Sequence, residues 1–170
     1  GSLFAEVLFT SSATEAANMA ILGSALAPCD ANRKRIVFGA AEHHCVLHTA
    51  ENLARLGFRV EQAPVDSNAR IDLDALADLL GEDVLLVAVM HANNEVGTIQ
   101  PVADVAELAH RVGARFFCDA VQTFGWQPWK VEDLGADFVA LSAHKLGGPK
   151  GCGAIYIRAG VKIAPLLVGG

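Results

Sequence analysis

A lysine within a short polar and glycine-rich stretch, residues 142–151, is the first residue that could do chemistry. Lys145 follows the run 137–141, which is apolar after Asp137 and reads as a strand. An amine at the end of a strand, among small residues and beside Ser142 and His144, suits Schiff-base formation better than solvation. A loop lysine beside a turn is the ordinary alternative, and Lys145 alone does not decide between the two.

Polar side chains also follow the other predicted strands, close to the point where each strand ends. The carboxyl ends of parallel strands share one edge of a sheet, so such side chains can converge on one site. Each has an ordinary structural explanation when taken singly, such as capping a turn or facing solvent. Their joint placement favours a common site. The set comprises Thr14, His43, Asn94, Asp119, Gln122, Ser142, His144 and Lys145.

Pyridoxal phosphate accounts chemically for this combination of groups. It needs a lysine for its imine, a carboxylate that keeps its pyridine nitrogen protonated, and a seat for its phosphate. Ser12 and Glu15 have capping-box spacing, which predicts a helix start directly after a strand. Free backbone N–H groups and the helix dipole favour a phosphate there. An ordinary capped helix has the same pattern.

The elements that must position these residues alternate between strands and helices. The unbroken apolar run 84–90 is typical of a central parallel strand that is covered on both faces. Pro101 suits the first turn of a helix. The predicted strands are 6–10, 35–39, 58–65, 84–90, 115–118, 137–141 and 153–158. The predicted helices are 16–27, 44–56, 73–80 and 101–112.

The order of these elements predicts an α/β fold. The last strand follows a glycine-rich turn rather than a crossover helix, so we expect it to run antiparallel to its neighbour. The expected architecture is a three-layer α/β/α sandwich with a mostly parallel seven-stranded sheet. Residues 1–170 are expected to form one domain.

Composition excludes several classes of partner. The chain has 170 residues, 52% of them hydrophobic, and a net charge of −6 without a basic cluster. We therefore expect neither nucleic acid nor a membrane as a partner. No apolar run is long enough to span a bilayer. The four cysteines show no paired spacing, which indicates reduced thiols and a cytoplasmic setting. They are Cys29, Cys45, Cys118 and Cys152.

Five motifs in one order resemble the cysteine desulfurases, a group of fold-type I, class V aminotransferase-like enzymes that use pyridoxal phosphate. They run over essentially the whole chain, and the Asn-Asn-Glu loop is similar to the NifS/IscS-like branch rather than the SufS-like one. The motifs are FTSSATEA at 9–16, EH at 42–43, MHANNEVG at 90–97, DAVQ at 119–122 and SAHKLGGPKG at 142–151.

The resemblance implies a role for each site residue. Lys145 would form the Schiff base, and Asp119 would pair with the pyridine nitrogen. His43 would stack on the ring and assist proton transfers. Gln122 would bond the phenolic oxygen, and Asn94 would lie beside the ring and the substrate carboxylate. The residues implied to hold the phosphate are Ala13, Thr14, Ser142 and His144.

The resemblance also implies a reaction and partners. The substrate would be L-cysteine, and the products would be L-alanine and a persulfide that is passed to iron–sulfur scaffold or thiolation proteins by a homodimeric enzyme. The family's persulfide cysteine lies beyond the lysine on a mobile loop, and none of the four cysteines matches it. We expect residues 1–170 to be the large cofactor-binding domain, without the small C-terminal domain and the N-terminal segment, and inactive alone.

Several alternatives stay open at this point. His44 and His48 are one helical turn apart beside Cys45, yet no further ligand has useful spacing, so no metal is expected. Residues 147–151 lack the spacing of a nucleotide-binding loop. Another enzyme of the same fold, such as a selenocysteine lyase, is an alternative. His43 argues against most transaminases, which place an aromatic residue over the ring. A non-catalytic module that binds pyridoxal phosphate is a further alternative.

Overall fold

The computed structural model describes residues 2–28 and 32–169. These residues contain a seven-stranded sheet with the order β1-β7-β6-β5-β4-β2-β3. The strands are β1 (Val7–Thr10), β2 (Arg35–Gly39), β3 (Arg59–Ala63), β4 (Val84–Ala88), β5 (Arg115–Asp119), β6 (Phe138–Ser142) and β7 (Gly153–Ile157). The helices are α1 (Ala13–Leu26), α2 (His44–Arg55), α3 (Leu73–Leu79), α4 (Val102–Arg111) and α5 (Val131–Leu134), with short 3-10 turns η1 (Phe4–Glu6) and η2 (Ala143–Leu146).

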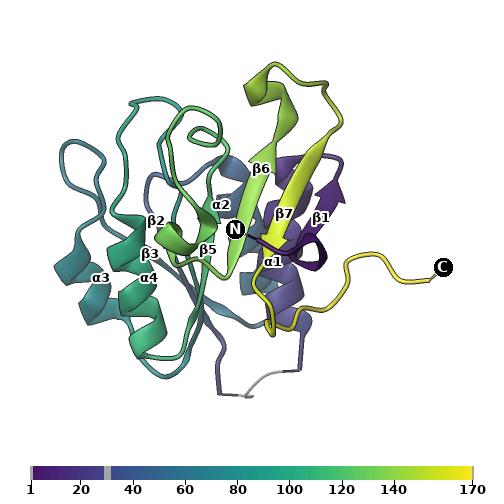
Figure 1. Cartoon of the computed structure of the whole chain (residues 1–170). Coiled ribbons are helices and arrows are strands. Elements are labelled where there is room, and N and C mark those ends of the chain that lie inside the picture. Colours follow the sequence, from purple (N-terminus) through teal and green to yellow (C-terminus); the bar gives the residue numbers. More distant parts are fainter. Residues whose placement is uncertain (1, 29–31, 170) are drawn as a thin grey trace.

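Helices cover both faces of the sheet (Figure 1). On one face α1 and α2 pack through Ala17, Ile21 and Leu53 against apolar side chains of the sheet. On the other face α3, α4 and α5 pack through residues such as Leu76 and Val105. All five residues of β4 are buried, as its unbroken apolar sequence predicts for a strand covered on both faces. The predicted three-layer α/β/α architecture is confirmed.

The predicted antiparallel strand is also confirmed. β7 pairs antiparallel with both β6 and β1, whereas the pairs among β2, β3, β4, β5 and β6 are parallel. The connection between β6 and β7 is too short for the crossover that a parallel neighbour needs. The carboxyl ends of β1, β2, β4, β5 and β6 therefore lie along one edge of the sheet.

Some local predictions differ from the structure. Pro101 is the N-cap of α4 and not part of its first turn, which begins at Val102. The short elements α5 and η2 were not predicted, because four residues are too few to show a helical period. β4 ends at Ala88 rather than at Met90. The remaining boundaries lie within three residues of the predicted ones.

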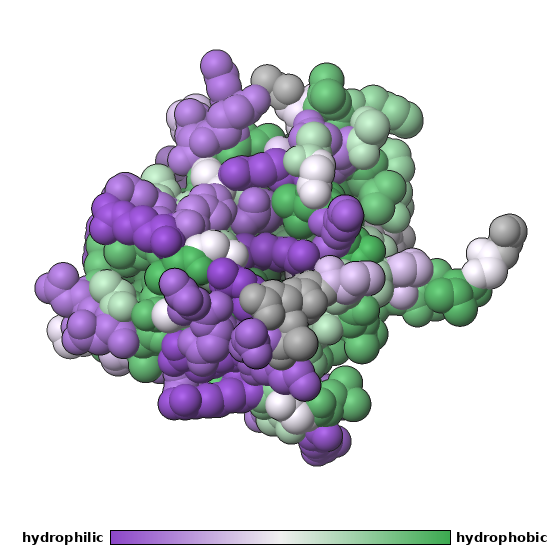
Figure 2. Space-filling view, turned by 90° about the horizontal axis from the view of Figure 1, so that it is seen from below, coloured by the Kyte–Doolittle hydropathy of each residue, from purple (hydrophilic) through white to green (hydrophobic). Residues whose placement is uncertain are grey.

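The surface combines a polar edge with exposed apolar side chains. Figure 2 looks onto the edge opposite the carboxyl ends of the parallel strands, and hydrophilic residues dominate there, with hydrophobic residues gathered on the side from which the C-terminal segment projects. A groove on that side is lined by Leu3, Leu8, Met19, Ile163 and Leu167, among others. In the described part of the chain, no helix has the length and hydropathy needed to cross a bilayer.

Candidate functional site

The first turn of α1 forms one wall of the site. Ser12 is the N-cap, and its hydroxyl accepts the Glu15 N–H at 3.2 Å, which confirms the predicted helix start. The reciprocal bond of the capping box differs from the prediction, since the Glu15 carboxylate accepts the backbone N–H and the hydroxyl of Ser11 at 2.7 and 2.6 Å. Ala13 and Thr14 follow the cap, where backbone N–H groups have no intrahelical acceptor. This turn can therefore bind an anion.

A glycine in β7 lets this turn approach the sheet closely. A Cβ atom on Gly153 would lie 2.6 Å from the Ser12 carbonyl carbon and 3.0 Å from the Ala13 nitrogen. The Thr10 hydroxyl donates to the Ser12 carbonyl at 2.8 Å and ties the turn to the end of β1. Any larger residue at position 153 would push the turn away from β7.

Asp119 is the last residue of β5 and lies at the floor of the site. Its side chain accepts the Val121 N–H at 3.0 Å, and the residue is only 6% exposed. Burial raises the pKa of this carboxyl above its ordinary value, while the Val121 N–H and the nearby His43 ring partly oppose the rise. A cation placed against Asp119 would complete this environment, because it would compensate the desolvated carboxylate.

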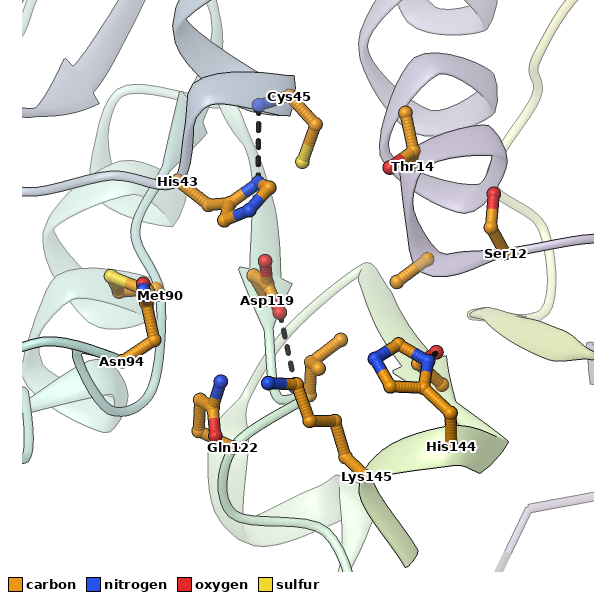
Figure 3. Close-up of a pocket in the computed structure, with 13 residues that line it drawn as sticks. Ser12, Thr14, His43, Cys45, Met90, Asn94, Asp119, Gln122, His144 and Lys145 are labelled. Atoms are coloured by element: carbon orange, nitrogen blue, oxygen red, sulfur yellow. Dashed lines mark hydrogen bonds between the residues drawn. The ribbon is translucent and has the colours of Figure 1, made fainter. Parts of the chain in front are cut away.

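His43 precedes α2 and caps it. Its Nδ1 accepts the Cys45 N–H at 3.1 Å, as Figure 3 shows. A ring nitrogen that accepts a backbone N–H carries no proton, so the neutral ring holds its proton on Nε2. The cap thus fixes both the tautomer and the orientation of the ring beside the cavity.

Lys145 lies on η2, directly after β6. Its amine points toward Asp119 and Gln122 in Figure 3. The Ser142 hydroxyl and His144 Nδ1 are 2.8 Å apart, which orients the His144 ring at the cavity wall. A positive φ of 76° at Gly147 ends η2. The strand end and the short turn together present the amine to the floor of the site.

All of these groups line one cavity of about 200 Å³. The structure brings together every residue that was predicted for the site. They are Ala13, Thr14, His43, Asn94, Asp119, Gln122, Ser142, His144 and Lys145. The cavity is also lined by residues that were not predicted as site residues, namely Ser12, Cys45, Met90 and Val121.

Cys45 has a sequence signal that could have placed it in the cavity, namely its position in the first turn of the helix that His43 caps. Burial, together with the neighbouring Asp119 and Glu42 carboxylates, raises the pKa of the Cys45 thiol to about 12. The buried Cys118 also has a raised pKa, and Cys152 is exposed. Cys29 lies outside the described residues.

The histidine cluster considered as a metal site does not assemble one. The ring centroids of His44 and His48 are 5.6 Å apart. No group of three or more His, Cys, Asp or Glu side chains in residues 2–28 and 32–169 could hold a metal ion. The polar groups at the carboxyl edge of the sheet are therefore the candidate site.

Comparisons with a family model and with curated proteins agree on the relatives of this chain. The family model of the class-V aminotransferases matches residues 2–170. Cysteine desulfurase IscS of Dictyoglomus turgidum is 46% identical over 97% of this chain and 42% of its own length. A putative cysteine desulfurase, IscS 1 of Bacillus subtilis, is 45% identical over 100% of this chain and 45% of its own length.

Solved structures agree with the sequence relatives. A NifS-like protein superposes with a TM-score of 0.92 at 44% identity, covering 97% of this chain and 46% of that one. SspA in complex with cysteine superposes with a TM-score of 0.93 at 33% identity, covering 100% and 49%. The chain thus spans somewhat less than half the length of these relatives.

Proposed function

The chain belongs to the class-V aminotransferase family, and on that premise we propose that it is the cofactor-binding large domain of a cysteine desulfurase that uses pyridoxal phosphate. The related proteins named cysteine desulfurase IscS support this proposal at 42–47% identity. The whole enzyme would act on L-cysteine, as a homodimer, and would deliver sulfur to an iron–sulfur scaffold or thiolation protein.

One observation carries the proposal, namely that a carboxylate, an amine and a helix N-terminus face the same cavity. Asp119, Lys145 and the first turn of α1 come from three separate parts of the chain and all line it. These are the donors that pyridoxal phosphate needs for its pyridine nitrogen, its aldehyde carbon and its phosphate. Among the described residues Asp119 forms no ion pair within 4 Å, although the Lys145 amine points toward it and the His43 ring lies nearby. The residues present therefore fit the cofactor.

The family resemblance gives each side chain a proposed role, and all of these side chains line the cavity. Asp119 would hold the proton on the pyridine nitrogen, and Lys145 would anchor the cofactor covalently and move protons at the substrate. His43, with its Nε2 proton at the cavity, would stack on the ring. Gln122 would bond the phenolic oxygen, and Asn94 would lie beside the substrate carboxylate. When bound, pyridoxal phosphate supplies an electron sink for the substrate's α-carbon.

The phosphate would be held by two neighbouring segments, since Gly153 of β7 pairs with Ser142 and also lies against Ser12 and Ala13. The α1 turn would offer backbone N–H groups, and the end of β6 would offer a hydroxyl and an imidazole. The hydrogen bond between Ser142 and His144 keeps the imidazole oriented toward that position. The phosphate ligands proposed are Ala13, Thr14, Ser142 and His144.

The proposed reaction transfers one sulfur atom from L-cysteine to a thiol. The C–S bond of L-cysteine breaks, and the sulfur forms an S–S bond with the thiol, which loses its proton and becomes a persulfide. The β-carbon keeps the electron pair of the broken bond and gains a proton to give L-alanine. The thiols of Cys45 and Cys118 are unsuited as acceptors, since burial keeps both protonated at neutral pH. Cys152 is exposed but does not line the cavity. None of the four cysteines, Cys29 included, matches the nucleophile of the family that the chain resembles, so we propose that the accepting thiol lies outside residues 1–170.

Covalent labelling tests the assignment of the cofactor. The purified chain is titrated with pyridoxal phosphate while its absorbance is recorded, reduced with borohydride, and digested for mapping by mass spectrometry. We expect the label on Lys145. Lys150, which is exposed on the following turn and outside the cavity, is the internal control. A label on Lys150 but not on Lys145 would refute the site.

Activity assays separate an enzyme domain from a binding module. We expect the 170-residue chain to release neither sulfide nor alanine from L-cysteine above the background of free pyridoxal phosphate. Covalent binding at Lys145, combined with turnover by a longer chain that carries the same residues, would support the desulfurase. Sustained turnover by residues 1–170 alone would contradict the placement of the accepting thiol.

A further inference from the structure

The loops that carry His43 and Asn94 need a connection that backbone pairing does not supply. His43 follows β2 and Asn94 follows β4, and these neighbouring strands pair in parallel up to Phe38 and Ala88. Beyond that point no backbone hydrogen bond joins the two segments to each other among the described residues, although Ala40 still bonds Ala63 and His91 still bonds Asp119. His43 and Asn94 nevertheless line the same cavity, so their relative position must be set by other contacts.

Two side-chain bonds join the loops just past the end of the pairing. The Glu42 carboxylate accepts the Met90 N–H at 2.8 Å. The Asn93 amide donates to the Ala41 carbonyl at 2.9 Å. In the first bond a side chain of the His43 loop accepts a backbone N–H of the Asn94 loop, and in the second a side chain of the Asn94 loop donates to a backbone carbonyl of the His43 loop. We call these two bonds the Glu42–Asn93 clamp.

The Glu42 side chain is buried in space that is free because residue 39 is a glycine. Glu42 is 7% exposed, and a Cβ atom on Gly39 would lie only 2.9 Å from its Oε1. Its second oxygen, Oε2, has no hydrogen-bond partner among the described residues. Burial and, to a lesser extent, the charge of Asp119 raise the pKa of Glu42 well above its ordinary value. A neutral acid keeps the Met90 bond without placing a second charge beside Asp119.

The Asn93 side chain holds its own loop as well as the neighbouring one. Its Oδ1 accepts the N–H groups of Glu95 and Val96 at 2.8 and 2.9 Å, which fixes the turn that contains Asn94. Its Nδ2 is the donor that reaches Ala41. An aspartate at this position would keep the turn and lose the donor.

We propose that Glu42 and Asn93 are positioning residues, which lock the His43 turn to the Asn94 loop so that both cavity-facing side chains are set as one unit. The clamp itself is independent of the cofactor, while its part in binding pyridoxal phosphate rests on the function proposed above. Neither residue lines the cavity floor with Asp119 and Lys145. Their effect on the site is therefore indirect.

Matched variants separate the clamp from general stability. Asn93→Asp removes the donor and keeps the turn, and Asn52→Asp makes the same change at an exposed position of α2. Glu42→Gln keeps the acceptor and the volume, and Glu42→Leu removes the acceptor. Three measurements are made: amide exchange at Met90, the nitrogen chemical shifts of the His43 ring, and the dissociation constant of pyridoxal phosphate.

We expect Asn93→Asp and Glu42→Leu to weaken pyridoxal phosphate binding about tenfold, the effect of one lost hydrogen bond. Both should shift the His43 ring resonances without cofactor, and Glu42→Leu should speed exchange at Met90. Asn52→Asp and Glu42→Gln should match the unmodified chain. Unchanged His43 ring resonances in Asn93→Asp would overturn the proposal. If Glu42→Leu does not fold, the result for Asn93→Asp alone decides whether the proposal holds. Failure of the unmodified chain to bind at Lys145 would refute the proposed function and leave the resonances to decide the clamp.

Discussion

Two buried carboxyl groups lie close together at the site, and their environments give them different tasks. Asp119 lines the cavity, whereas Glu42 lies beside it and bonds the Met90 N–H. Burial raises the pKa of both, and the charge of Asp119 raises that of Glu42 further. Neighbouring carboxyls do not both ionise readily. Glu42 therefore retains its proton more strongly, which leaves Asp119 as the anion available to a cation in the cavity.

The two raised pKa values predict how stability depends on pH in the chain without cofactor. Above about pH 4.5 the unfolded chain has released protons that folded Glu42 retains, so the free energy of unfolding falls as pH rises, by at most about 1.4 kcal/mol per unit for one group. Asp119 acts in the same direction from a lower starting pH. Glu42→Gln should remove the contribution of Glu42, so that the free energy of unfolding depends less on pH.

Urea unfolding of the unmodified chain and of Glu42→Gln between pH 4.5 and 8 measures how the free energy of unfolding of each depends on pH. Carboxyls with lowered pKa values, such as Glu15 and Asp83, act in the opposite direction but are common to both chains, so the difference isolates Glu42. We expect that difference to grow with pH in favour of Glu42→Gln. A constant difference over this range would show that Glu42 ionises as an ordinary carboxyl.

The thiols provide a second test at the scale of single residues. With a pKa of about 12, Cys45 has a thiolate fraction of about 0.0001 at pH 8, whereas an ordinary thiol with a pKa near 8.5 has about a quarter. We expect iodoacetamide to label Cys45 about a thousand times more slowly than the exposed Cys152. Peptide mass spectrometry over time measures both, with the urea-unfolded chain as control. Equal rates in the folded chain would contradict the raised pKa of the half-buried Cys45.

At the scale of elements, local sequence signals predicted most of the helices and strands, whereas contacts between residues distant in the sequence could not be predicted. Ser12 caps α1 as the sequence predicted, and Asp72 caps α3 in the same way, because a cap bonds N–H groups two or three residues away. The Glu42–Asn93 clamp could not be predicted, since its bonds join residues 48 and 52 positions apart. The site residues converge because they follow strands of one direction, and that rule needs no knowledge of strand order.

The close approach of α1 to β7 gives a prediction about these elements. Gly153→Ala places a methyl group 2.6 Å from the Ser12 carbonyl carbon, so the first turn of α1 must shift. We expect the affinity for pyridoxal phosphate to fall at least about tenfold, because the N–H groups at a helix start bind the phosphate only when correctly placed. Ala154→Ser, at the next position of the strand and on its opposite face, is the control.

Fluorescence titration with pyridoxal phosphate and thermal unfolding separate binding from stability. If the phosphate site shifts in Gly153→Ala, the affinity for pyridoxal phosphate falls while the melting temperature changes little. Binding of inorganic phosphate also weakens. Equal affinity for pyridoxal phosphate in Gly153→Ala and in the unmodified chain would show that the α1 turn does not bind the phosphate.

At the scale of the molecule, the strand order assembles the site from distant parts of the sequence. β1 pairs with β7, which pairs with β6, so the first strand and the strand before Lys145 lie two positions apart. The same arrangement leaves β1 at one edge of the sheet, where Phe9 is 86% exposed and Leu8 is 46% exposed. An edge strand with exposed apolar side chains and few charges can pair with another chain.

This exposed edge predicts that the isolated 170-residue chain self-associates. Phe9→Lys adds a charge to β1 without touching the core, so we expect it to reduce the associated fraction several-fold, since a charge on an edge strand opposes pairing. Gln62→Lys adds the same charge to β3, the opposite edge, and is the matched control. Analytical ultracentrifugation over a range of concentrations measures the distribution. Equal reduction by both variants would contradict a contact specific to β1, whereas a reduction confined to Phe9→Lys places the contact on β1.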